Sequence, residues 1–350
     1  MSNRFLVYGV TGYTGELVLR YCQERGLNPI IAGRDSVKVE KLAKQYGFES
    51  RSFPLTEGNS IVEGLNGVNV VLHCAGPFRR TSASMVEACL RKAVHYLDIT
   101  GEIEVFEALA ARDEEAQKAG VMLLPGVGFD VVPSDCLAAH LKKRLPAATH
   151  LTLAFQGLGG ISRGTATTMV EKIGQGGAAR RDGKIVNVPA AWKSREIDFG
   201  RGAVSCATIP WGDVATAFYS TGIPNIEVYS ALPAAARGMM VASRYFGWLL
   251  ASGPGQRILK GFVNAQPAGP DDEARQRGRT YLYGEVSDAQ GNRVAARQSG
   301  PEGYTTTALT ALAITEKVLA GNFRAGFQTP AKAYGPDLIL EIAGVMREDI

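Results

Sequence analysis

The sequence is poor in the residues that build disulfide frameworks and metal sites. Its five cysteines are odd in number and lie far apart without a Cys-x-x-Cys pair, so we expect reduced thiols in a cytoplasmic protein. Its four histidines form no pair with ligand spacing, and we therefore predict no metal site. The start of the chain reaches Gly9 after only a short apolar run, which is typical of a first strand and not of a signal peptide.

The sequence also has little excess charge of either sign. Its net charge is +4, and its basic residues occur in scattered groups that we interpret as solvated faces: Arg79–Arg80, Lys142–Arg144 and Arg180–Arg181. No aromatic residues alternate with them, which argues against a nucleic-acid partner. Hydrophobic residues make up 45% of the chain, and a length of 350 residues predicts two domains of a globular α/β enzyme.

Glycine, in contrast, is abundant, and three glycines are regularly spaced near the start. Gly9, Gly12 and Gly15 lie between an apolar strand, 5–8, and a helix with apolar residues at helical spacing. In a dinucleotide-binding turn the first glycine allows the turn, the second lets the backbone approach a diphosphate, and the third lets the helix pack against the strand. An ordinary glycine-rich turn is the alternative. The predicted phosphate-binding set is Gly9, Thr11, Gly12, Tyr13, Thr14 and Gly15.

A second strand, 28–34, ends where such folds distinguish NAD from NADP. A carboxylate there binds the ribose hydroxyls of NAD, whereas a small residue followed by arginine accepts the 2′-phosphate of NADP. Gly33 and Arg34 fit the second pattern. Asp35 is the competing signal, but it precedes the helix 37–46, where capping is its favoured role. We predict NADP, with NAD less favoured.

Further strands alternate with helices of the first domain, at 49–55, 69–75, 95–100 and 120–124. This alternation predicts a doubly wound parallel sheet, a Rossmann-type fold whose ligands lie at the carboxyl ends of the strands. The loop of Cys74, Ala75, Gly76 and Pro77 joins the predicted cofactor site there. His73, inside an apolar strand, is interpreted as a core histidine in preference to a catalytic acid.

Carboxylates at the same strand ends are the candidate catalytic groups. Hydride transfer needs a polar group near the developing negative charge, and Asp98, Glu102 and Asp130 are placed for it. For each of them a structural role in capping a loop or helix is the alternative, and the favoured one.

From about Thr149 the pattern changes to the alternation of a mainly antiparallel sheet, with strands at 184–188, 204–209, 226–230 and 280–286 and a hairpin turn at 288–292. A glycine-rich loop, 157–164, leads into a helix, 165–173, whose N-terminus with Arg163 is either an anionic-substrate site or an ordinary capped helix. The predicted domains are 1–130, nucleotide-binding; 131–303, α+β, for substrate and dimerisation; and 304–350, a helix and tail returning to the first domain. An antiparallel sheet with one helix layer leaves a face to cover, so we predict a homodimer.

The segment 234–250 is the most apolar stretch outside the first domain. It is too short to span a bilayer, because its uncharged run, 245–256, falls below the ~20 apolar residues that a crossing needs. Three interpretations remain: Met239, Phe246 and Leu250 pack on the core; the helix forms a lid over a hydrophobic substrate channel; or it lies on a lipid surface. Among the functional ones we favour the lid.

Taken together, five motifs carry a family resemblance: Gly9–Gly15, Ala32–Arg34, Cys74–Phe78, Tyr96–Glu102 and Gly128–Asp135. The chain resembles the saccharopine dehydrogenase-like oxidoreductases, and within them most the trans-acting enoyl reductases of lipid and polyketide synthesis. The resemblance implies a nucleotide domain, a substrate domain, and NAD(P)-linked hydride transfer in the cleft between them. The short-chain dehydrogenases are set aside, because none of the twelve tyrosines begins a Tyr-x-x-x-Lys motif.

The resemblance leaves the substrate open. A saccharopine-type imine or amino-acid dehydrogenase should line its cleft with arginines, and only Arg163, Arg79 and Arg80 are available by sequence. An apolar or acyl-type, enoyl, substrate therefore fits better, with peripheral lipid contact as a further option. A nucleotide-binding sensor without turnover is the alternative of another class.

Overall fold

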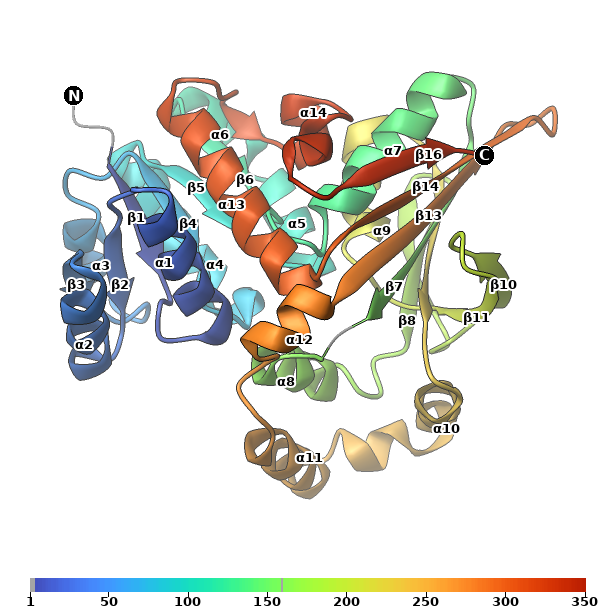
Figure 1. Ribbon diagram of the computed structural model, residues 1–350, viewed down its shortest axis with the longest axis horizontal. Helices are drawn as coiled ribbons and strands as arrows, with labels where there is room; N and C mark the ends of the chain where they lie inside the picture. The colour runs from blue at the N-terminus through green and yellow to red at the C-terminus, as the bar shows by residue number, and fades with distance from the viewer. Residues whose placement is uncertain (1–3, 159) are drawn as a thin grey trace. The chain divides into compact units, whose positions relative to one another are not determined.

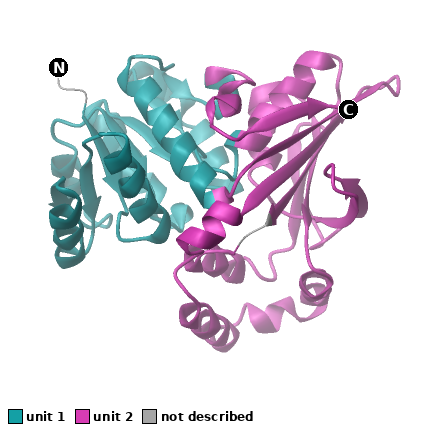
Figure 2. Ribbon diagram, viewed as in Figure 1, with its two compact units in different colours: residues 1–132, 304–333 teal, residues 133–303, 334–350 magenta. Residues whose placement is uncertain are grey.

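The computed structural model describes residues 4–158 and 160–350, so Gly159 of the predicted glycine-rich loop lies outside the described residues. The chain divides into two compact units (Figure 2). The first comprises residues 1–132 and 304–333, and the second comprises 133–303 and 334–350. The expected third segment, 304–350, is thus divided: its helix joins the first unit, whereas its end pairs its backbone with a strand of the second.

The first unit is a parallel sheet with helices between its strands (Figure 1). The strand order is β15–β6–β5–β4–β1–β2–β3. The strands are β1 (Phe5–Tyr8), β2 (Ile30–Gly33), β3 (Glu49–Ser52), β4 (Val70–His73), β5 (His95–Asp98), β6 (Met122–Leu124) and β15 (Gly326–Phe327). The helices are α1 (Tyr13–Glu24), α2 (Ser36–Tyr46), α3 (Gly58–Gly64), α4 (Phe78–Lys92), α5 (Ile103–Ala110), α6 (Asp113–Lys118), α13 (Gly303–Leu319) and α14 (Pro330–Tyr334).

The sheet is doubly wound, as predicted. The chain runs outward from β1 through β2 to β3 and then returns to β4 on the other side of β1, so right-handed crossovers place the two helix groups on opposite faces. The central strands β1, β2 and β4 are buried along their whole length, because both faces are covered. The strand order reverses between β1 and β4, and the carboxyl ends of the strands at such a reversal are the usual ligand position in doubly wound sheets.

The second unit is built on a mainly antiparallel sheet, also as predicted; β7 and β12 form its parallel pair. The main strand order is β10–β11–β12–β7–β13–β14–β16, with β8 and β9 beside β12. The strands are β7 (His150–Leu158), β8 (Gly177–Arg181), β9 (Lys184–Val188), β10 (Ser194–Asp198), β11 (Ala203–Thr208), β12 (Asn225–Ala231), β13 (Arg279–Ser287), β14 (Arg293–Pro301) and β16 (Met346–Asp349). The helical elements are α7 (Val132–Arg144), α8 (Arg163–Glu171), α9 (Asp213–Thr221), α10 (Ala234–Leu250), α11 (Gly253–Ala265), α12 (Asp272–Arg277) and the 3₁₀ helix η1 (Leu338–Glu341).

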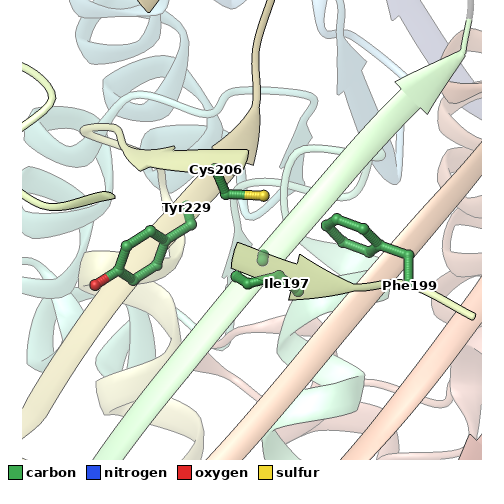
Figure 3. Packing of buried hydrophobic residues seen from close by; sticks show 5 residues of the cluster. Ile197, Phe199, Cys206 and Tyr229 are labelled. Carbon is green, nitrogen blue, oxygen red and sulfur yellow. The ribbon is translucent and has the colours of Figure 1, made fainter. Parts of the chain in front are cut away.

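This second sheet curls so that its end strand lies over its own middle. The Arg195 guanidinium of β10 donates to the Glu285 carboxylate of β13 at 2.8 and 3.2 Å, although three strands separate β10 from β13 in the sheet. The curl buries a cluster of Ala154, Ile197, Phe199, Cys206 and Tyr229 (Figure 3). Part of the face that we expected a second copy to cover is therefore covered by the sheet itself.

Arg180 corrects the interpretation of the basic pairs as solvated faces. Its side chain is buried, its Nε donates to the Val214 carbonyl at 2.8 Å, and its Nη1 donates to the Gly183 carbonyl at 2.7 Å. The guanidinium also lies 4.3 Å from the centre of the Phe218 ring. A fixed cation inside the unit thus donates to a carbonyl in the first turn of α9 and to one in the turn between β8 and β9.

Helix α10 corrects the interpretation of 234–250 as a core helix. Met239 and Phe246, which that interpretation buries, are 62% and 60% exposed. Leu250 is half-buried. Within the described residues, no helix is both long and apolar enough to cross a membrane.

Candidate functional site

The candidate site lies at the carboxyl ends of the first unit's strands. The parallel register places Tyr8 beside Ala32 on one side and beside His73 on the other, and His73 beside Asp98. The loops that follow β1, β2, β4 and β5 therefore leave the sheet along one edge. The predicted cofactor and carboxylate motifs of this unit lie in these loops, in the loop after β6, or at the strand and helix ends that border them.

The glycine turn after β1 has the geometry that a diphosphate requires. Gly9 has φ +94°, in the left-handed region, and a Cβ at Gly15 would lie 2.3 Å from the Gly9 carbonyl oxygen. A Cβ at Gly12 would meet nothing closer than 3.4 Å, and Gly12 is exposed. Gly12 also caps α1 without a side-chain hydrogen bond to the first turn. The turn is thus closely packed at Gly9 and Gly15, where it meets the strand, and open to solvent at Gly12, next to the N-terminus of α1. An open helix N-terminus fits an anionic ligand. Thr11 is exposed, and Tyr13 and Thr14 are half-buried.

The residues after β2 divide their roles as the NADP pattern requires. Asp35 accepts a hydrogen bond from the Lys38 backbone NH at 3.1 Å and caps α2, and this bond holds the pKa of its carboxyl below the usual range. The Lys38 ammonium lies 3.2 Å from the other carboxylate oxygen. Arg34 is exposed directly beyond the strand. The carboxylate is therefore engaged with the helix, and the guanidinium extends from the strand end.

The loop after β4 packs directly on the glycine turn. A Cβ at Gly9 would lie 2.8 Å from the Cβ of Ala75, so the two loops touch only because Gly9 lacks a side chain. Thr81 donates to the Ala75 carbonyl at 2.7 Å and contacts His73 Nε2 at 3.0 Å. Of the rest of this predicted set, Cys74 and Pro77 are half-buried and Gly76 is exposed. Burial lowers the pKa of His73 to about 3, which agrees with the interpretation of a neutral core histidine.

Asp98, at the buried end of β5, forms hydrogen bonds with the loops after β5 and β6. The Asp98 carboxylate accepts from the Thr100 NH at 2.9 Å, the Gly126 NH at 3.0 Å and the Tyr96 hydroxyl at 2.8 Å. The residue is fully buried, and this burial raises the pKa of Asp98 to about 6. These bonds account for Asp98 as a residue that holds the loops after β5 and β6 in place.

Glu102 has a similar structural role at α4. Its two carboxylate oxygens accept from the backbone NH groups of Phe78 at 2.8 Å and Arg79 at 3.1 Å, and the side chain is only 4% exposed. A buried carboxylate at a helix N-terminus satisfies the donors that the helix itself cannot. The bonds also tie the loop after β5 to the loop after β4.

Asp130 is the most exposed of the three candidate carboxylates. It is half-buried, and a Cβ at Gly101 would lie 2.5 Å from its Oδ2, so the loop after β5 makes room for this carboxylate. The structure thus brings Asp130 next to the loop that carries Asp98 and Glu102.

The helix that holds this loop, α13, was predicted from sequence, but its contacts with the loop were not. Thr307 of α13 accepts from the Phe129 NH at 3.0 Å, and Thr310 donates to the Val127 carbonyl at 2.7 Å. The Tyr304 ring, in the first turn of α13, lies 5.0 Å from the Tyr13 ring of the glycine turn. The only sequence signal was the glycine at position 128, where a Cβ would lie 2.8 Å from the Thr307 methyl group.

Arg163, the predicted substrate residue, belongs to the second unit. It is exposed at the first position of α8, and its backbone NH donates to the Ala268 carbonyl at 3.0 Å. The Ser162 hydroxyl accepts from the Thr165 NH at 3.2 Å and caps this helix. The capped-helix interpretation therefore accounts for the local geometry, and the substrate role of Arg163 stays a prediction.

Comparison with known proteins agrees with this geometry. Residues 5–124 match the family model described as the saccharopine dehydrogenase NADP binding domain. A trans-acting enoyl reductase of Mycobacterium ulcerans is 26% identical over 213 residues, which cover 56% of this chain and 51% of that protein. A saccharopine dehydrogenase-like oxidoreductase of Mus musculus is 28% identical over 160 residues, or 40% of this chain and 37% of that protein. The chain thus spans between a third and about half of the curated relatives' length.

A solved structure extends the comparison of the fold to the whole chain. Saccharopine dehydrogenase (L-Glu forming) from Saccharomyces cerevisiae matches with a TM-score of 0.69 over 99% of both chains, at 13% identity. At that identity the match supports the fold alone. The predicted resemblance to the saccharopine dehydrogenase-like oxidoreductases is confirmed, and the family model matched by residues 5–124 agrees with the prediction of NADP as the cofactor.

Proposed function

We propose, from the match of residues 5–124 to the family model of the saccharopine dehydrogenase NADP binding domain, that the protein is an NADPH-dependent reductase of an apolar or acyl-type, enoyl, substrate. The observation that carries the proposal is the division of roles after β2. Asp35 caps α2, whereas Arg34 is exposed at the strand end beside an open glycine turn. Bound NADPH would supply the hydride.

The chain's own residues would bind and orient the cofactor. The N-terminus of α1, with Thr11, Gly12 and Thr14, offers donors to a diphosphate. Arg34 offers a guanidinium fork to the 2′-phosphate. The loop of residues 74–77, held by Thr81, borders the position next to the turn where the rest of the dinucleotide would extend along the carboxyl ends of the strands.

Asp130 is our candidate for the polar group near the reacting atoms. Asp98 and Glu102 are buried and satisfied by backbone donors, so they act as positioning residues in this proposal. Asp130 is half-buried in a loop that two threonines of α13 hold in place. A carboxyl group there is able to hold or donate a proton.

The substrate class rests on the relatives named trans-acting enoyl reductase and on the scarcity of arginines among the site loops. A saccharopine-type imine or amino-acid dehydrogenase is the second candidate, favoured by the fold match over the whole chain. A cytoplasmic location and a homodimer remain proposals, and so does a sensor that binds NADP without turnover.

A screen of NADPH oxidation separates these functions. We would compare enoyl thioesters with keto acids plus amines, each with wild type and with Asp130→Asn. Turnover of enoyl thioesters alone supports the proposal, and turnover of keto acids with amines supports the dehydrogenase. NADPH binding without oxidation of any substrate in the screen supports the sensor. Unchanged turnover in Asp130→Asn would remove Asp130 from the mechanism.

A further inference from the structure

We propose that the outer face of α10, together with the exposed end of α11, docks the protein on an anionic lipid surface. We define the outer face as all solvent-exposed residues of α10 except Arg244, whose guanidinium is bound on the other side of the helix. All of them are apolar, glycine or tyrosine: Ala234, Ala235, Gly238, Met239, Val241, Ala242, Tyr245, Phe246, Trp248 and Leu249. A surface helix of a soluble protein normally presents the opposite pattern, with its polar side outward.

The orientation of α10 is fixed by contacts on its other side. A Cβ at Gly247 would lie 2.8 Å from the Cα of Gly174, so the helix backbone rests directly on the turn after α8. Arg244 donates to the carbonyls of Ala190 and Ala191, each at 2.7 Å, and Arg237 donates to the Ser205 hydroxyl. The two arginines and the glycine hold one side of α10 on its unit. The outer face is therefore the side that these contacts leave in solvent.

Helix α11 continues the same surface. A Cβ at Gly255 would lie 2.5 Å from the Leu249 carbonyl oxygen, so the connection between the two helices is tight. The Gln256 amide donates to the Val170 carbonyl at 2.8 Å, and the Lys260 ammonium lies 2.6 Å from the Glu171 carboxylate, which together anchor α11 to α8. Its Ile258 and Phe262 side chains are nevertheless 63% and 69% exposed. Figure 1 shows α8, α10 and α11 gathered at the lower end of their unit in that view.

The charged residues of α10, α11 and their flanking segments are all positive, which favours an anionic partner. Residues 228–270 contain no aspartate or glutamate, and their charged residues are Arg237, Arg244, Arg257 and Lys260. Arg237 and Arg244 anchor the other side of α10 and Lys260 pairs with Glu171, so the exposed Arg257 is the cation next to the outer face. A two-fold contact with a second copy uses one patch twice, so it would offer these cations no carboxylate from residues 228–270. An anionic membrane surface complements them, and exposed Trp, Tyr and Phe are the side chains that enter the boundary between headgroups and acyl chains.

The test is co-sedimentation of the full-length protein with vesicles of phosphatidylcholine, with and without phosphatidylglycerol. We expect binding to the anionic vesicles, and a loss of at least about tenfold in Trp248→Ser/Leu249→Ser. Met239→Ser and Met346→Ser form a matched pair, since these methionines are 62% and 70% exposed and only the first lies on α10. Met239→Ser should weaken binding and Met346→Ser should not. Arg257→Gln should weaken binding to anionic vesicles about fivefold.

Thermal unfolding and NADPH binding of these variants serve as controls, because exposed side chains should change neither. Equal binding of wild type to neutral vesicles, or unchanged binding of the double variant, would overturn the proposal. A concentration-dependent dimer that Trp248→Ser/Leu249→Ser abolishes, without vesicle binding, would assign the surface to a second copy. Loss of turnover on an acyl substrate in that variant, again without vesicle binding, would support the lid. The proposal does not depend on the reductase activity.

Discussion

Replacing Gly12 by valine should separate folding from cofactor binding. A Cβ at this position meets nothing closer than 3.4 Å, and the backbone has φ −91° and ψ 161°, a conformation that β-branched residues adopt freely. We therefore expect the free energy of unfolding without NADPH to change by about 1 kcal/mol or less. The new side chain instead fills the space in front of the α1 N-terminus, where the diphosphate would lie.

The comparison variant is Gly15→Ala. Its Cβ would lie 2.3 Å from the Gly9 carbonyl oxygen and 2.8 Å from the Val10 Cα, so the helix has to move away from the strand. We expect this variant to lose about 3 kcal/mol of stability even without ligand. The smaller substitution should thus damage the fold, whereas the larger one should not.

Thermal unfolding with and without NADPH measures both effects. At a ligand concentration of about 100 Kd, binding should stabilise the wild type by about 2.7 kcal/mol, and Gly12→Val should show none of this. A Gly12→Val protein that keeps the NADPH-dependent stabilisation would refute the assignment of the turn. A Gly15→Ala protein as stable as wild type would refute the close packing.

Four other substitutions test the remaining assignments. Arg34→Ala should weaken NADPH binding about 30-fold, or about 2 kcal/mol, and leave NADH binding almost unchanged, as read by titration calorimetry; equal losses for both cofactors would contradict the 2′-phosphate contact. Because burial raises the pKa of Asp98 from 3.8 to about 6, its contribution to stability is present below about pH 4 and is lost as the pH rises through about 6. Urea unfolding from pH 4 to pH 6 should therefore show a decline of about 3 kcal/mol in wild type that Asp98→Asn lacks, and parallel curves would contradict the burial argument. Arg180→Met should lower the unfolding free energy by about 2 to 3 kcal/mol, because the carbonyls of Val214 and Gly183 lose this buried donor. Arg181→Met, which breaks a partly exposed pair with Glu227, should cost about 1 kcal/mol or less, and similar losses in both would contradict the difference in burial.

The parts of the first unit that were predicted from sequence are those with short-range signals. The strand at 5–8 has the predicted bounds, because four apolar residues end at a glycine that the turn requires. Asp35 was interpreted correctly as a cap, since capping depends on residues only three positions away. The helical stretch between β5 and β6 is divided into α5 and α6, although the sequence pattern alone indicates one continuous helix. No glycine or proline marks the break, and Arg112 bridges Glu87 and Glu115 there through its side chain.

What the sequence could not reveal depends on distant contacts. The strand β10 is polar in four of its five residues, and it is held by Arg195 and by the curl of the sheet more than by its own pattern. For α10, hydrophobic periodicity left core packing, a lid and a lipid surface open, and the structure shows that Met239 and Phe246 are exposed. The support of the 127–130 loop by Thr307 and Thr310 joins residues far apart in the chain, which no local pattern records.

That support has a consequence for the order in which a ribosome can complete the protein. The loop at 127–130 leaves the ribosome early, but its partner threonines on α13 follow only after the second unit, 178 and 183 residues later. At about 5 to 20 residues per second, the nascent nucleotide-binding unit waits roughly 10 to 35 seconds for its last helix. During that interval the methyl-sized space beside Gly128 is unfilled and β6 lacks its neighbour β15. A chain released before residue 333 therefore carries all five N-terminal motifs and still has an incomplete cofactor domain.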